Sequence, residues 1–171
     1  SNMSLLEGHA LYALADAQKI HGLFMLEELN KKTFYEIYDD YQDNLKNFSD
    51  KKLKSNLNKA IDKSSNDIKI AFAETEPDFH LSAQKFFVNA ENYIDAIEGN
   101  IKTYNDILSF YKKNINNLND IYDDVSLSLK HDSLLDNQHR AHDHMTKLAG
   151  DYSESHSELI LWLSEYSDVG I

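Results

Sequence analysis

The 171-residue chain carries 29 acidic and 17 basic residues, and its formal net charge is −12. Such a field repels nucleic-acid phosphates and anionic lipid surfaces, so we expect no nucleic-acid partner and no membrane partner. The chain holds no cysteine, which excludes disulfides, cysteine-ligated metal centres and thiol catalysis.

Glycine and proline are scarce, at five residues and one residue, which favours long helices over a strand-rich fold. Ser1 and Asn2 precede Met3 and are interpreted as a cloning remnant, so we expect a single domain over residues 3–171. The apolar run of residues 159–163 is too short to span a bilayer. No basic stretch followed by an apolar one opens the chain, so we expect a cytoplasmic protein, or one exported without a cleaved signal peptide.

The first predicted segment runs from about Ser4 to Phe48, where apolar residues recur at heptad spacing. The pattern breaks at Glu27 and Lys31, and Gly22 lies just before the break. The segment is predicted to form either one kinked helix or two helices.

A second helix is predicted to start at the cap Ser49-Asp50 and to end before Pro77. Its apolar face is thin, and Ser64-Ser65-Asn66 weakens it further because these side chains compete for backbone hydrogen bonds. Pro77 itself is expected in the first turn of the next helix.

The strongest helical signal lies between Phe79 and Leu129, where apolar residues alternate in steps of four and three. This spacing is typical of coiled-coil-like packing. We therefore expect one helix over residues 78–130, roughly 80 Å long at 1.5 Å per residue. Gly99-Asn100 could kink this helix, although the spacing continues across the pair.

His131-Asp132-Ser133 is predicted to separate the third helix from a fourth, which keeps the same spacing to Tyr166. Residues 167–171 are expected to fray. The sequence thus predicts an all-α fold, an elongated antiparallel helical bundle of about four long helices with coiled-coil-like packing.

The predicted helix lengths raise the question of what covers the third helix. A second helix of about 25 residues cannot cover the seam of a helix about 53 residues long. Other helices must cover the rest, or another molecule must, because monomers avoid a large exposed apolar stripe. The seam residues expected to be covered least form the candidate interaction seam: Tyr104, Leu108, Tyr111 and Ile115.

Residues 130–144 are rich in His and Asp and contain a candidate metal site. Asp136, His139 and Asp143 share one helical face at i, i+3 and i+7, a spacing that lets their side chains converge on one cation. If the first and fourth segments pack antiparallel, Glu27 and Glu28 come level with the histidines, and zinc or another divalent metal accepts such a mixture. The candidate ligands are His139, His142, His144, Asp136, Asp143 and Glu28.

Two other interpretations of the same tract stay open. The residues also fit an ordinary solvated helix face, in which Asp136 and Arg140 form a simple i,i+4 pair. Alternatively, His142 and His156 fall on seam positions, where protonation would be costly and the bundle would respond to pH.

No catalytic motif is present, so we expect no enzyme. The chain lacks Glu-x-x-His, His-Glu-x-x-His, Gly-x-Ser-x-Gly and a P-loop. The sequence favours a non-enzymatic module for protein–protein interaction, such as an adaptor, a secretion-associated protein or an effector, acting as a homo-oligomer or with a protein partner. The alternative is a ligand- or metal-binding sensor bundle that uses the fourth helix.

Overall fold

The structure, a computed structural model, describes the backbone of residues 1–168 and the side chains of residues 1–165. Its elements are α1 (Asn2–Met25), α2 (Lys31–Phe48), α3 (Lys51–Phe72), α4 (Pro77–Lys113), the single-turn 3₁₀ helix η1 (Ile115–Asn117), α5 (Asp120–Asp123) and α6 (Val125–Asp168). The described part of the chain contains no strand. The predicted all-α helical bundle is confirmed.

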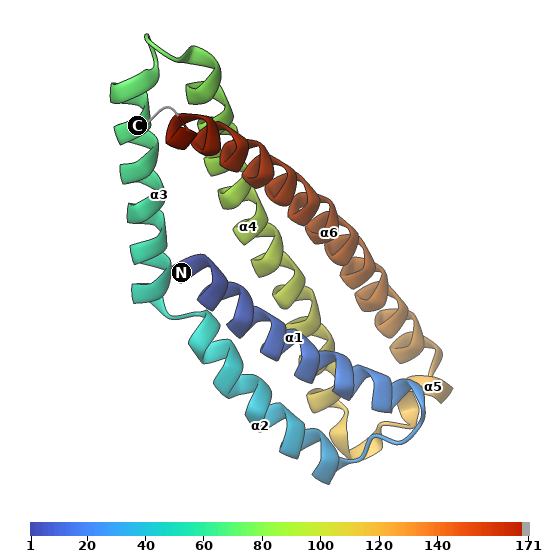
Figure 1. Cartoon of the computed structure of the whole chain (residues 1–171). Helices are drawn as coiled ribbons and strands as arrows, with labels where there is room; N and C mark the ends of the chain where they lie inside the picture. Colours follow the sequence, from blue (N-terminus) through green and yellow to red (C-terminus); the bar gives the residue numbers. More distant parts are fainter. Residues whose placement is uncertain (169–171) are drawn as a thin grey trace.

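The long helices α4 and α6 run antiparallel and lie side by side (Figure 1). α1 pairs antiparallel with α2, and α1 packs against the half of α4 that ends at Lys113. α3 lies beside the half of α4 that begins at Pro77. α4 therefore packs against α1, α3 and α6, whereas α2 packs mainly on α1.

The core follows α4, whose buried face carries apolar side chains at the spacing predicted from the sequence. Ile97, Ile107 and Leu108 are each 2% exposed or less. Fully burying one side chain of this size stabilises the fold by about 1.5–3 kcal/mol. The helix is unbroken through Gly99, which forms no boundary.

The first predicted segment forms two helices, because α1 ends where the apolar pattern fails. Past Met25 the chain closes with two backbone hydrogen bonds: Glu27 N–H donates to the Phe24 carbonyl (3.0 Å) and Glu28 N–H donates to the Leu23 carbonyl (2.8 Å). This pairing is the Schellman motif, which requires a left-handed residue after the helix. Glu27 occupies that position with φ of 59°.

Replacing Glu27 by glycine is expected to stabilise the protein by about 0.5–1 kcal/mol. An L-residue in the left-handed region costs energy that glycine does not incur. Urea denaturation of the Glu27→Gly variant at a fixed protein concentration measures the gain. A Glu27→Ala variant keeps the strain and serves as the control, so an equal gain in both variants would contradict this explanation.

The single helix predicted over residues 78–130 is wrong, because α4 ends at Lys113. Four of the six residues from 114 to 119 are asparagine, which competes with the helix for backbone hydrogen bonds. Asn114 does so directly: its side-chain Nδ2 donates to the Phe110 carbonyl at 2.9 Å. The apolar spacing runs on past this break, but the helix does not.

The boundary predicted at His131-Asp132-Ser133 is also wrong, because α6 begins at Val125 and continues through it. The start is set by Asp124, whose carboxylate accepts from the Leu127 backbone N–H at 3.0 Å in the manner of an N-cap. The fraying predicted for residues 167–171 falls mostly outside the described residues, since α6 is helical through Asp168 and residues 169–171 are not described.

A buried polar pair lies between α4 and α6. Gln138 Nε2 donates to Asn100 Oδ1 at 3.1 Å, and Asn100 Nδ2 donates to the sulfur of Met145 at 3.4 Å. Asn100 is 1% exposed and Gln138 is 6% exposed. A polar pair inside an apolar seam fixes the register of two helices, because any slip leaves both amides unsatisfied.

Candidate functional site

The predicted interaction seam is not a free surface. Tyr104, Leu108 and Tyr111 are 6%, 0% and 0% exposed, and all three belong to the molecule's own core. Ile115 is half-buried in η1 and packs against the same core. The seam prediction is therefore wrong as a docking site, because the separation of α1 from α2 and the early start of α6 bring both α1 and α6 onto this part of α4.

The predicted metal ligands are not brought together. Among the residues that the structure describes, no group of three or more His, Asp or Glu side chains could hold a metal ion. The candidate ligands are all exposed: His139, His142, His144, Asp136 and Asp143 on α6, and Glu28 in the loop after α1.

The observed helix boundaries explain why Glu27 and Glu28 do not lie beside the candidate histidine ligands of α6. The end of α1 lies level with the second turn of α6, where the rings of Phe24 and His131 are 4.8 Å apart. His142 lies eleven positions further along α6, about 16 Å at 1.5 Å per residue. Glu27 and Glu28 therefore approach the start of α6.

Three side chains from three helices form a hydrogen-bonded chain, which we call the His–Tyr–His chain: the half-buried His21 of α1, and the buried Tyr111 of α4 and His131 of α6. Tyr111 Oη lies 2.8 Å from His21 Nδ1 and 2.8 Å from His131 Nε2. Tyr111 is fully buried, and His131 is 6% exposed. The hydrogen bonds of the His–Tyr–His chain therefore link the α1–α2 pair to the α4–α6 pair.

Aromatic rings pack around the His–Tyr–His chain. The Phe24 ring stacks on Tyr111 with centroids 4.5 Å apart and on Tyr122 at 4.6 Å, and meets the edge of His131. The Tyr122 hydroxyl donates to the Phe24 carbonyl, which links α5 to the end of α1. Offset and edge-to-face aromatic pairs each contribute about 0.5–1.5 kcal/mol beyond burial.

Burial shifts the titration of all three members of the His–Tyr–His chain. It lowers the pKa of His21, which nearby His131 and His139 lower further. It lowers the pKa of His131 also, and Asp132 acts in the opposite direction. It raises the pKa of the Tyr111 phenol far above its ordinary range. Both imidazoles are thus held in the neutral form at pH 7.

The sequence pattern does not identify His21 or His131 as functional residues. The sequence pattern predicts a helix boundary at His131, whereas the structure places His131 on the buried face of α6. His21 lies three residues before Phe24 and so shares its helix face, but nothing local indicates a partner 90 residues away.

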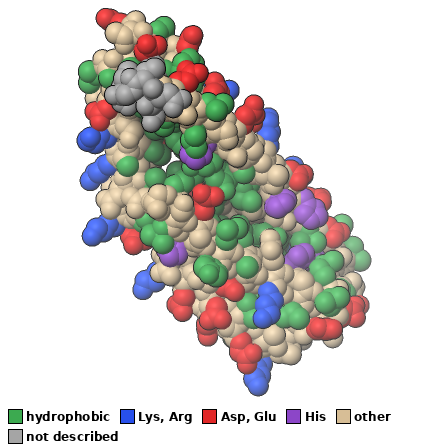
Figure 2. Space-filling view, in the orientation of Figure 1, with side chains coloured by type: hydrophobic (Ala, Val, Ile, Leu, Met, Phe, Trp, Pro, Cys, Tyr) green, Lys and Arg blue, Asp and Glu red, His purple; other side chains and the backbone are tan. Residues whose placement is uncertain are grey.

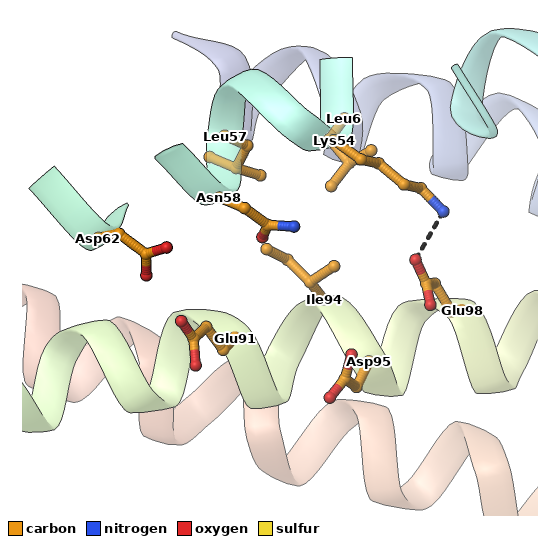
Figure 3. Close-up of a pocket in the computed structure, with 9 residues that line it drawn as sticks. All are labelled: Leu6, Lys54, Leu57, Asn58, Asp62, Glu91, Ile94, Asp95 and Glu98. Atoms are coloured by element: carbon orange, nitrogen blue, oxygen red, sulfur yellow. Dashed lines mark hydrogen bonds and ion pairs between the residues drawn. The ribbon is translucent and has the colours of Figure 1, made fainter. Parts of the chain in front are cut away.

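A second polar feature is the acidic hollow between α3 and α4, with a volume of about 490 Å³. Figure 3 shows the carboxylates of Asp62, Glu91 and Asp95 around it, with Lys54 and Glu98 joined at one end. Lys54 Nζ and Glu98 Oε1 are 2.6 Å apart. No ion pair of the other three carboxylates occurs in the described part of the chain, so the hollow is lined by unpaired acidic groups and is negatively charged.

The outer face of α1 is the third feature. Leu5, Leu11 and Tyr12 are 51%, 66% and 68% exposed there. Figure 2 shows hydrophobic side chains across the middle of this side of the molecule, with most charged side chains toward its edges. The first half of α1 therefore carries exposed apolar side chains on its solvent face, and the exposed Gln18 and Lys19 follow further along the helix.

The fold and these surfaces define an all-α helical bundle, and within residues 1–168 no helix combines the length and apolar character needed to cross a membrane. Compared with family models, curated proteins and solved structures, the chain matches none.

Proposed function

We propose that the protein is a non-enzymatic interaction module that pairs with a second copy of itself through the outer face of α1. The observation that carries the proposal is the exposure of Leu5, Leu11 and Tyr12 on one helix face. Apolar side chains on the solvent face of a helix, in addition to those on its buried face, favour a further contact on the solvent face. Contiguous exposed apolar surface of this kind marks interaction sites.

Two glycines in α1 support close approach by another helix. Glycine inside a helix costs about 0.5–1 kcal/mol relative to alanine. A Cβ added at Gly8 or Gly22 would meet no atom within 4 Å, so packing within one molecule does not require glycine there. Gly8, Ala15 and Gly22 recur every seven residues, and small side chains at this spacing leave room for a second backbone.

The charge distribution favours a second copy as the occupant. With a net charge of −12, two copies repel each other unless they meet where neither presents acidic groups. The two acidic residues of α1 are already engaged within the molecule: Tyr93 Oη donates to Glu7 Oε2 at 3.0 Å, and Asn44 Nδ2 donates to Asp16 Oδ2 at 2.8 Å.

The sequence of the outer face also suits self-pairing. In an antiparallel pair of α1 helices centred between Leu11 and Tyr12, Gly8 lies opposite Ala15 of the second copy and Leu11 lies opposite Tyr12. Such an interface is the same patch on both molecules, as two-fold symmetry requires. Lys19 falls opposite Ser4, so no like charges meet along the face.

The test compares two substitutions that add the same charge at equally exposed leucines. Leu11→Glu changes the proposed face, and Leu129→Glu, at a leucine 64% exposed on α6, is the matched control. The dimer contains the Leu11 contact twice, so Leu11→Glu should raise the dimer dissociation constant at least tenfold. Sedimentation equilibrium over a range of concentrations measures it, and circular dichroism checks that both variants keep their helices.

Three results would overturn the proposal. The wild type could remain monomeric at the highest concentration reached. Leu11→Glu could dimerise as well as the wild type, which would place the interface elsewhere. Leu129→Glu could weaken pairing equally, which would point to general charge repulsion.

A further inference from the structure

The His–Tyr–His chain joins helices that are distant in sequence, and it contains two imidazoles, the side chain whose ordinary pKa lies closest to neutral pH. We propose that this chain is an acid-sensitive latch: it holds α1 against α4 and α6 while at least one imidazole is neutral, and it releases α1 when both are protonated. The proposal does not depend on self-pairing, since the latch lies inside one molecule.

Counting protons shows why double protonation destabilises the chain. Tyr111 has one phenolic hydrogen, so it donates to one imidazole nitrogen and accepts from an N–H of the other. If His21 alone is protonated, its Nδ1–H donates to Oη, and Oη still donates to His131 Nε2. If His131 is protonated as well, both flanking N–H groups can only donate to Oη, and the buried phenolic hydrogen is left without an acceptor among the three side chains.

Electrostatic repulsion adds to the cost of the unsatisfied phenolic hydrogen. The rings of His21 and His131 lie with centroids 6.2 Å apart, so double protonation places two positive charges side by side, one on the buried His131 and one on the half-buried His21. His139 of α6 adds to the repulsion on His21, while Asp132 favours the charged form of His131. The other titratable side chains around the chain are Tyr104 of α4, Tyr122 of α5 and Glu27, which acts on Tyr122.

The sign of the pH dependence follows from the lowered pKa of each histidine. Once α1 opens, each imidazole regains its ordinary pKa of 6.5 and binds protons more readily than in the closed state. The latch is therefore complete above pH 6.5 and weakens as the pH falls through the lowered values. Each histidine contributes up to a tenfold rise in the opening constant of α1 per pH unit.

The test measures hydrogen–deuterium exchange of the α1 amides at pH 7 and pH 5, corrected for the intrinsic exchange rate at each pH. Residues 17–25 should lose protection at pH 5 by more than tenfold, while α3 keeps its protection. His131→Phe retains an aromatic ring against Phe24 and Phe110 but cannot be protonated. The loss of α1 protection between pH 7 and pH 5 should therefore shrink to the loss expected from protonation of His21 alone. His144→Gln removes an exposed histidine of the same helix and should leave the effect unchanged.

A second measurement keeps the proposal testable if His131→Phe does not fold. Nuclear magnetic resonance titration of the wild type should show two histidines with midpoints below those of the exposed histidines. The latch is overturned if α1 is equally protected at both pH values, if His131→Phe keeps the full pH effect, or if either latch histidine titrates with the exposed ones.

Discussion

The Phe24→Ala variant is expected to lose about 3–5 kcal/mol of unfolding free energy, a large part of the total for a domain of this size. Phe24 is 1% exposed, and its ring fills the space between Tyr111, Tyr122 and His131. Truncation removes the burial of the ring, leaves a cavity and deletes three aromatic contacts. α1, α4, α5 and α6 meet at this ring, so neighbouring helices cannot collapse into the space without moving the His–Tyr–His chain.

Urea denaturation followed by circular dichroism measures this loss, with all proteins at one concentration because pairing shifts apparent stability by mass action. The adjacent Met25→Ala variant is the control: Met25 is 54% exposed and should change stability by no more than about 0.5 kcal/mol. A loss below about 1 kcal/mol for Phe24→Ala would show that the cluster is not tightly packed.

The Gln138→Leu variant is expected to lose about 1–3 kcal/mol even though it adds apolar volume to the seam. Removing the amide leaves Asn100 Oδ1 without a donor in the interior of the α4–α6 interface. The cost of an unsatisfied buried acceptor exceeds the gain from one apolar side chain, because the acceptor loses its partner without regaining water.

The double variant Asn100→Leu/Gln138→Leu should recover much of that loss, since neither amide is then left unsatisfied. The comparison is a double-mutant cycle measured by urea denaturation, and a coupling of about 0.5–3 kcal/mol between the two positions is expected. Purely additive losses would contradict the view that the two amides act as a pair.

The fold class was predictable because burial selects apolar residues at helical spacing. The buried face of α4 from Phe79 to Tyr111 follows the steps of three and four found in the sequence. The spacing fails as a guide beyond Lys113, since it records the positions of apolar residues and not whether the backbone continues its hydrogen bonds. The asparagines after Lys113 were the local signal for the break.

The candidate sites were less predictable, because their members come together only through tertiary packing. Tyr111 was correctly placed on a seam, but its two imidazole partners come from α1 and α6. The outer face of α1 did leave a signal in the sequence: Leu11 and Tyr12 lie on the side opposite the seam, in a stretch with no Asp, Glu, Lys or Arg between Glu7 and Asp16.

The arrangement of the helices into two antiparallel pairs has a consequence for how the chain folds. α1 and α2 are joined by residues 26–30, and α4 and α6 are joined by residues 114–124, which contain η1 and α5, so each pair closes a loop much shorter than the sequence separation between the pairs. The bonds that join the pairs, from His21 to Tyr111 and from Tyr122 to Phe24, bridge 90 and 98 residues of sequence. We therefore expect two hairpins to form early and their docking to be the late, slow step of folding.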